Sequence, residues 1–369
     1  MTDYPVRQFS FGAIDRAGKL LATDIPLDRV NDEAVREAFK TAHNWRMAHA
    51  YPMVAERMRL NHIAKGGFVT AGRVKRMTSV RKKLKRGSAT LRGMQDLAGC
   101  RAVMTSVADC YHVFEAYKNG ASASEFHRSR DYMAEPKPDG YRGIHAILRF
   151  GGTGRSEPYI GQHLELQIRT RLQHIWATAI EAIGAVRGED LKGGQGDASW
   201  LRLMALMGDY LAVCDGLPLP DGYQGTHGLC RQINEMDRSL NALVNLKMIN
   251  EVIERASNAP SQSHVFRLSL DAVTGKLMVE VQRGFVLIGD EYMRQETEQQ
   301  QSVVVNVNRV IDLKRAFPNY YLDLGAFIRH LAWAVQYRLV APKMMVATPS
   351  LDNLDLSFLT KWKRTKKPA

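Results

Sequence analysis

The sequence predicts a mixed α/β (α+β) protein, in which helices flank a mixed β-sheet domain and a smaller C-terminal α+β module follows. Three observations predict it. Apolar and polar residues alternate strictly over 163–169, which is the side-chain period of a strand with one buried face. A turn rich in proline and glycine, 136–143, leads into a second apolar strand at 144–150. Helix-period apolar stripes lie before and after these strands, so we expect helices and strands to share one domain.

The N-terminal part, 1–64, is expected to be a hairpin and helical segment that packs on the sheet domain. We predict a short hairpin around Gly18. A helix should begin after Asn31 or Asp32, either of which can cap it, and run to about residue 50. Pro52 should interrupt or kink this helix before a second helical segment.

The sheet domain is predicted to span 65–190. Its strands are expected at 98–105, 125–132, 144–150 and 163–169, with a helix at 107–117. Thr170 can cap a last helix. On that helix a core stripe of five apolar residues is expected to face inward: Ile175, Trp176, Ala179, Ile180 and Ile183. His174, Ala177 and Glu181 share the neighbouring face.

Two connectors divide the rest of the chain. A glycine-rich stretch at 190–197 and the segment 258–263 should bound a helical connector, 191–260, with helical patterns at 200–214 and 229–256. After it, two strands around a Thr-Gly turn, a strand at 303–307, a helix at 324–339 and a basic tail predict an α+β module over 261–369. The helices around 229–256 are our candidate surface for a homo-oligomer, whose existence the sequence leaves open.

Composition narrows the class of protein. Of 369 residues, 45% are hydrophobic and 24% charged, as in ordinary globular proteins. No apolar run reaches the ~20 residues that cross a bilayer, the N-terminus lacks a signal-peptide pattern, and the four cysteines lack zinc-site spacing. We therefore expect a cytoplasmic protein without a membrane partner.

The net charge of +13 is concentrated in two places, the C-terminal tail and a block in the first third of the chain. Ten Lys and Arg residues and no acidic residue lie between Lys65 and Arg92. Such a block predicts a polyanionic partner: a nucleoside triphosphate, RNA, or both.

Polar residues at the strand ends are the candidate site. Glu165, Gln167 and Arg169 share one face of the alternating strand, either as a solvated surface or as ligand contacts. Asp96 lies in an apolar setting, where a carboxylate is costly unless it is paired, for instance with Arg92 or Arg101, or bound to a metal.

Four blocks in the chain resemble the synthetase domain of the RelA/SpoT family: GRVKRMTSVRKKLKR, MQDLAGCRAVM, DYMAEPKPDGYRGIHAIL and LELQIRTRLQHIWATAIEAIG. The resemblance covers about 65–190 and implies a nucleotidyltransferase-like fold. It also implies a Mg²⁺-dependent pyrophosphokinase that moves the β,γ-diphosphate of ATP to the 3′-hydroxyl of GDP or GTP, making (p)ppGpp. No His-Asp dipeptide occurs in the chain, so the hydrolase half of long family members is not expected.

The resemblance also implies roles for individual residues. Asp96 and Glu165 correspond to catalytic magnesium ligands, and the glutamate also activates the acceptor hydroxyl. The expected ATP-binding residues are Arg73, Lys75, Ser79, Lys83 and Arg101. Tyr141 corresponds to a tyrosine that stacks on the acceptor base, although by itself it is typical of a turn aromatic packed on the sheet. The other expected acceptor-binding residues are Lys137, Arg142, His145, Gln167 and Arg169.

The chain departs from the family at Gly143. Many members have serine at this position, and we expect looser acceptor positioning from the glycine.

Two other functions remain open. A toxin-type enzyme that modifies the 3′ end of tRNA would suit the basic block. A nucleotide-binding regulator without turnover is the third hypothesis.

Overall fold

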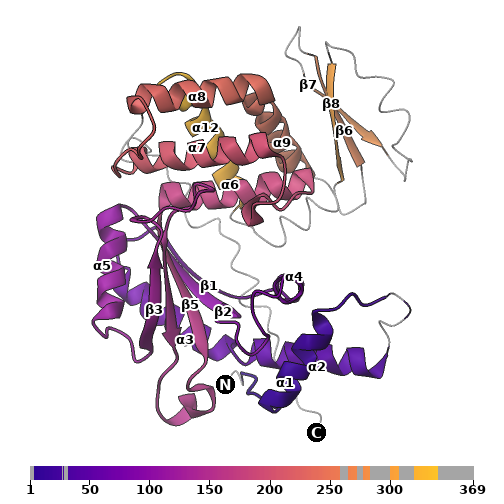
Figure 1. The fold of residues 1–369 in the computed structure, drawn as a ribbon, viewed down its shortest axis with the longest axis vertical. Coiled ribbons are helices and arrows are strands. Elements are labelled where there is room, and N and C mark those ends of the chain that lie inside the picture. Colours follow the sequence, from indigo (N-terminus) through magenta and orange to yellow (C-terminus); the bar gives the residue numbers. More distant parts are fainter. Residues whose placement is uncertain are drawn as a thin grey trace.

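The computed structural model describes residues 4–26, 28, 32–257, 265–271, 277–282, 300–306 and 320–339. The predicted mixed α+β architecture is confirmed. A five-stranded mixed sheet lies between a group of helices above it and the N-terminal helices below (Figure 1). No helix in these described ranges combines the length and apolar character that crossing a membrane requires.

The main sheet has the strand order β1-β2-β5-β4-β3. Its strands are β1 (Val69–Val74), β2 (Ala98–Met104), β3 (Glu125–Asp131), β4 (Ile144–Arg149) and β5 (His163–Thr170). Only β2 and β5 pair in parallel; every other neighbouring pair is antiparallel. The four predicted strands are confirmed. Strand β1 was not predicted, because the short sequence VTAGRV lacks a clear alternation and forms a strand by pairing with β2.

One face of this sheet is apolar. The predicted alternation in β5 is confirmed, because Leu164, Leu166 and Ile168 are all at most 1% exposed. They pack with α3 (Ala50–Ile63) and α5 (Val107–Lys118), the helices that cover this face. Burial of these side chains leaves the opposite face of β5, with Glu165, Gln167 and Arg169, to form the site.

The N-terminal segment is helical, so the predicted hairpin around Gly18 is wrong. Helix α1 (Phe11–Leu21) begins at Ser10, whose hydroxyl accepts a hydrogen bond from the Ala13 amide. Gly18 lies inside the helix, where an added Cβ would come within 2.7 Å of the Leu91 Cβ. The glycine therefore serves close packing rather than a turn.

Helix α1 packs with α2 (Glu33–Met47) and α4 (Met77–Lys85) around a second apolar core. Val80 and Leu84 are the buried residues of α4. The helices at the N-terminus therefore hold α4, whose lysines and arginines belong to the basic block. The predicted break between helices is confirmed, since α3 begins at Ala50 with Pro52 in its first turn, where the missing amide proton is tolerated.

A third core joins the remaining helices. They are α6 (Arg171–Arg187), α7 (Ala198–Cys214), α8 (Gly225–Leu240), α9 (Ala242–Ser257) and α12 (Tyr320–Val335). The cap and core stripe predicted for α6 are confirmed: the Thr170 hydroxyl accepts from the Gln173 amide at 3.2 Å, and the stripe is buried. The helical run predicted at 229–256 is two helices, because Asn241 adopts φ 47° and ends α8.

A second, three-stranded antiparallel sheet is formed by β6 (Val265–Asp271), β7 (Leu277–Gln282) and β8 (Gln300–Asn306), in the order β7-β6-β8. The predicted strand pair is confirmed; its Thr-Gly turn and the basic tail lie outside the described residues. Helix α12, which we expected within the module at 261–369, packs on α6, α7, α8 and α9. The domain limits themselves stay predictions.

Truncating the core of α12 tests this arrangement. Phe327 is fully buried in the helical core, so Phe327→Ala should lower the free energy of unfolding by about 3–5 kcal/mol in urea. Arg329→Ala, an exposed position on the same helix, is the control. A loss below about 1 kcal/mol would mean that α12 is not part of this core.

Candidate active site

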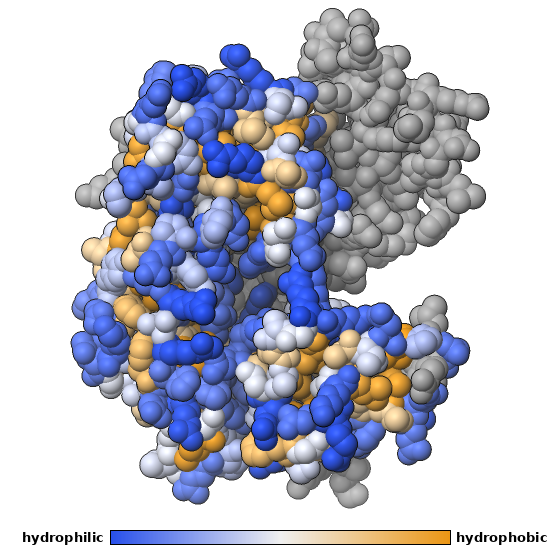
Figure 2. Space-filling view, in the orientation of Figure 1, coloured by the Kyte–Doolittle hydropathy of each residue, from blue (hydrophilic) through white to orange (hydrophobic). Residues whose placement is uncertain are grey.

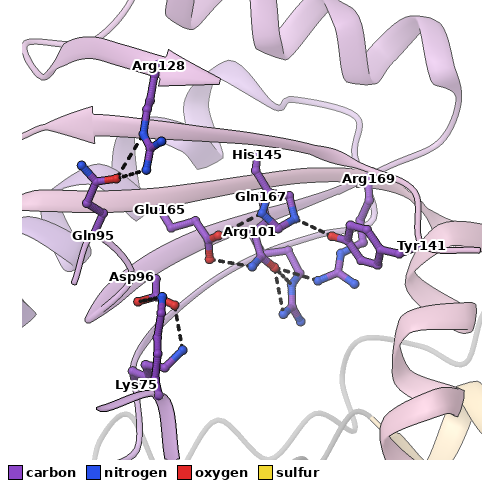
Figure 3. Close-up of polar contacts among 11 residues, drawn as sticks. Lys75, Gln95, Asp96, Arg101, Arg128, Tyr141, His145, Glu165, Gln167 and Arg169 are labelled. Carbon is purple, nitrogen blue, oxygen red and sulfur yellow. Dashed lines mark hydrogen bonds and ion pairs between the residues drawn. The ribbon is translucent and has the colours of Figure 1, made fainter. Parts of the chain in front are cut away.

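The polar face of the sheet brings residues from three strands into one row. Glu165 on β5 lies opposite Gly99 of β2, and two residues further Gln167 lies between Arg101 of β2 and His145 of β4. Figure 3 shows these side chains joined by a continuous series of polar contacts. The row results directly from the pairing of β5 with both neighbours, since side chains opposite each other point to the same face.

Glu165 is held as an ionised carboxylate. His145 Nδ1 donates to Glu165 Oε1 at 2.9 Å, and the Gln167 amide donates to Oε2 at 2.7 Å. Burial alone would raise the pKa of Glu165, but the hydrogen bond and charge of His145, the Gln167 amide and the charge of Lys75 outweigh it and hold the pKa at about 2. At neutral pH the group is a hydrogen-bond acceptor and a source of negative charge.

The His145 ring connects Glu165 to the turn at 136–143. Its second nitrogen, Nε2, lies 2.6 Å from the Tyr141 hydroxyl. Nδ1 carries a proton, as the contact to Glu165 requires, and Nε2 has the Tyr141 hydroxyl as its partner. Burial raises the pKa of Tyr141, which keeps this hydroxyl protonated.

Gly99 allows Glu165 to lie this close to β2. A Cβ on Gly99 would stand 2.6 Å from the Glu165 carbonyl oxygen and 3.3 Å from its Cβ. The first atom belongs to the backbone and has no rotamer by which to move away. The glycine is therefore a requirement of the site's packing.

Asp96 lies just before β2 and is bound by two lysines. Lys75 Nζ is 2.8 Å from Oδ2, and Lys83 Nζ is 3.0 Å from Oδ1. The side chain is 19% exposed, so burial of the carboxylate is compensated by two cations rather than by Arg92 or Arg101. Lys75 follows β1, whereas Lys83 lies on α4, so the N-terminal helices that hold α4 also place Lys83.

Two arginines on the other side of Glu165 share a single neutral acceptor. Gln167 Oε1 accepts from Arg101 at 3.2 Å and from Arg169 at 2.9 Å. Arg169 is only 2% exposed, and the described residues give its Nε no hydrogen-bond partner. Burial and the charges of Arg169 and Arg73 lower the pKa of Arg101 to about 9, so its guanidinium stays cationic at neutral pH. A buried and a half-buried cation on one amide oxygen make a strong anion site.

Helix α6 and the loop after it lie near this face. Burial would raise the pKa of Glu181, but its ion pair with Lys192 outweighs this and lowers it, with help from Arg73 and Arg101. Figure 2 shows hydrophilic residues around a recess between the upper helices and the α1–α2 part. No group of three or more His, Cys, Asp or Glu side chains suited to a metal occurs among the described residues.

The remaining predicted residues lie at the edges of the row or away from it. Arg73 is exposed on β1, opposite Gly99, and Ser79 is exposed on α4. Lys137 Nζ lies 5.0 Å from the ring centre of Tyr141 and 4.6 Å from that of Tyr132. Tyr141 itself is 6% exposed and packs edge-on against Trp176, so its ring has no open face for the predicted stacking.

Arg142 is not brought to the row. It is 4% exposed, and its guanidinium donates to Asp209 Oδ1 at 2.7 Å and to the Gly140 carbonyl. The expected contact with acceptor phosphates does not agree with this position. Its neighbour Gly143 has φ 145°, and a Cβ there would stand 3.3 Å from the Ile168 carbonyl oxygen. The backbone conformation and the close approach therefore favour a glycine at this position. We had expected Gly143 only to loosen the positioning of the acceptor.

Sequence reasoning missed two further cations on the polar face, Arg128 and Arg130 of β3. A β-bulge at His127 shifts the register, so that Phe126 faces the core while Arg128 lies opposite Ile147 and Arg130 opposite His145. Arg128 reaches the side chain of Gln95, the residue before Asp96 (Figure 3). Alternation alone places Arg128 on the core face, and nothing in the sequence marks the bulge.

A sequence model of the family described as "Region found in RelA / SpoT proteins" matches residues 72–184, which include all of the row. We call this segment, which is similar to that family, the RelA/SpoT domain. GTP pyrophosphokinase YjbM of Bacillus subtilis is 37% identical over 118 residues, which are 30% of this chain and 53% of that protein. GTP pyrophosphokinase YwaC of the same organism is 32% identical over 117 residues, 30% of this chain and 54% of that protein.

The chain spans about half the length of these two Bacillus subtilis proteins. The Escherichia coli GTP pyrophosphokinase is 30% identical over 141 residues, 36% of this chain and 17% of that protein. Among solved structures, small alarmone synthetase 1 from Bacillus subtilis bound to its product pppGpp is similar with a TM-score of 0.41 and 22% identity, over 48% of this chain and 94% of that one.

Adding a methyl group at Gly99 should push β2 and β5 apart. Gly99→Ala is expected to lower the free energy of unfolding by about 1–3 kcal/mol, the usual effect of overpacking. Gly12→Ala is the control, because its Cβ meets only the end of the Arg16 side chain at 3.6 Å and alanine favours a helix. Urea unfolding measures both. A Gly99→Ala protein as stable as the wild type would contradict the close approach.

Acid should destabilise the RelA/SpoT domain through Glu165. Because the folded pKa of about 2 lies below the ordinary 4.5, the group contributes stability above pH 4.5 that is lost as pH falls toward 2. The loss is on the order of 3 kcal/mol at most. Glu165→Gln should show a shallower decline over that window, whereas the exposed Glu235→Gln should follow the wild type. Equal slopes for Glu165→Gln and wild type would show that the pKa is not depressed.

Proposed function

We propose that this chain is a pyrophosphokinase that moves the β,γ-diphosphate of ATP to the 3′-hydroxyl of GDP or GTP. The observation that carries the proposal is the row itself: the ionised Glu165 lies with a lysine pair at Asp96 on one side and with Arg101 and Arg169 on the other. The names of the relatives, GTP pyrophosphokinases, support the same reaction.

The reaction needs positioning and charge more than covalent chemistry from the protein. The acceptor 3′-oxygen attacks the β-phosphorus of ATP and releases its proton to solvent, the bond from that phosphorus to the α,β-bridging oxygen breaks, and AMP leaves. Lys75, Lys83 and Arg101 are proposed to bind the triphosphate. Arg169 and Lys137 are proposed to bind the acceptor. These cations neutralise charge that builds up on the phosphate oxygens during transfer.

Glu165 is proposed to orient the acceptor hydroxyl. A carboxylate with a pKa of about 2 is a weak proton acceptor at neutral pH, so general-base strength is not its main contribution. It remains ionised, and its oxygens can accept a hydrogen bond from the 3′-hydroxyl. His145 and Gln167 keep the carboxylate in one orientation while it does so.

Asp96 and Glu165 also fit a magnesium site. Mg²⁺ is commonly held by one or two carboxylates together with substrate phosphates, and both groups border the same polar face. We propose these two as its ligands, with Lys75 and Lys83 turning from Asp96 to the phosphates when substrate binds. Bound Mg²⁺ would neutralise triphosphate charge and make the acceptor hydroxyl more acidic.

Removing either carboxylate should strongly reduce transfer. Asp96→Asn and Glu165→Gln are each expected to lower kcat by about 100-fold to 1,000-fold, the scale for a lost electrostatic contact in a transition state. Glu235→Gln should keep wild-type activity. The assay supplies γ-³²P-ATP and Mg²⁺ with GDP, GTP or tRNA separately, and follows labelled product and AMP.

The acceptor in that assay separates the hypotheses. Labelled ppGpp or pppGpp supports the proposal. Label on tRNA alone would replace it with the toxin-type activity, and nucleotide binding without AMP release would indicate a regulator. The exposed cations at the end of α4 and just after it give tRNA no particular support, because Lys82 and Arg86 pair with Asp190 and Lys85 pairs with Asp24.

A further inference from the structure

We propose that helix α7 holds the turn at 136–143 in its active position, with Asp209 as the positioning residue. The turn carries Lys137 and Tyr141 and leads into His145, so its position decides where the acceptor side of the site lies. The inference about catalysis rests on the proposed function. Its structural part, that Asp209 orders the turn, does not.

The first observation is a contact between two backbones. A Cβ on Gly208 of α7 would stand 2.3 Å from the Gly140 carbonyl oxygen, and one on Gly140 would stand 2.9 Å from the Ala205 Cα. Gly140 also has φ 90°, which favours glycine. The turn therefore lies directly on the helix backbone, with a glycine on each side of the contact.

The second observation is a buried ion pair beside that contact. Arg142 donates to Asp209 Oδ1 at 2.7 Å, and the Tyr223 hydroxyl donates to Asp209 Oδ2. The Arg142 side chain is 4% exposed and that of Asp209 17%. A charge buried this far is costly when its partner is removed, so Asp209 has a strong influence on where Arg142, and with it the turn, can lie.

The turn transmits its position to Glu165 through short contacts. Asp139 accepts from the Tyr141 amide at 2.9 Å, which orders the tip of the turn. The Tyr141 hydroxyl contacts His145, and His145 contacts Glu165. A shift of the turn on α7 would therefore move the hydrogen bond that orients the proposed catalytic carboxylate.

The residues that hold the turn come from a different part of the chain. Gly208, Asp209 and Tyr223 all follow residue 184, the last that the RelA/SpoT model matches. Their helix belongs to the core that also contains α6, α8, α9 and α12. We infer that this helical core contributes the acceptor-side geometry of the RelA/SpoT domain.

The kinetic test compares Asp209→Asn with Asp221→Asn in the full chain. The control removes the same charge from an exposed position on the loop after α7. For Asp209→Asn, kcat/KM for the acceptor should fall by about tenfold or more, since a displacement near 1 Å can cost up to about 100-fold. The Kd of a non-hydrolysable ATP analogue should change less than about twofold, because Lys75, Lys83 and Arg101 lie on other elements. Tyr223→Phe, a milder change, should shift the acceptor value in the same direction.

Hydrogen exchange tests the positioning without reference to activity. In Asp209→Asn, amides of 137–143 should exchange faster, while those of β2 and β5 keep wild-type rates. Unchanged exchange in the turn, or an equal increase in turn and sheet, overturns the proposal. The proposal is also overturned if the wild type is active and Asp209→Asn has the same kcat/KM for the acceptor. If the wild-type protein transfers no diphosphate, only the proposed function is contradicted. The exchange result would still decide whether Asp209 orders the turn.

Discussion

The parallel pairing of β2 with β5, with Gly99 opposite Glu165, is the constraint on which the rest of the site depends. It brings Glu165 against the β2 backbone and, two residues further along both strands, places Arg101 beside Gln167. The apolar core beneath the sheet fixes the register of this pairing. Because Leu164, Leu166 and Ile168 are buried in that core, the polar side chains of β5 must lie on the opposite face of the sheet. A one-residue slip would bury Glu165 and expose the core.

Each flank of the row is then supplied by a separate apolar core. The core of α1, α2 and α4 holds Lys83 on one side, and the core of α6, α7, α8, α9 and α12 contains Tyr141 on the other. The flanks carry more positive charge than the row neutralises, since Arg101 and Arg169 share a neutral amide. Arg169 is buried against this neutral amide, which destabilises the folded protein, and a bound anion would relieve that cost. Such strain is expected at binding sites.

Much of the sheet and of the site was readable in the sequence, for a specific physical reason. Alternation in β5 and the local pattern of 98–105 depend only on neighbouring residues, and these predictions are confirmed. Features that depend on tertiary contacts were missed. Gly18 suggests a turn until Leu91 packs on it, VTAGRV becomes a strand only beside β2, and the bulge at His127 follows from pairing with β4. Arg142 shows the same limit, because its partner Asp209 lies 67 residues away.

The chain order of the helical core gives the C-terminal half a structural connection to the site. After α9 the chain forms β6, β7 and β8, and then returns as α12 to pack on α6 and α7. Both ends of the segment with the second sheet are therefore anchored in the core that contains Tyr141 and carries Asp209. A change in the packing of α12 would reach the turn at 136–143 through α7, with no contact between the second sheet and the substrate required. Helix α7 is the element through which such a change would act, because it contacts both α12 and the turn directly.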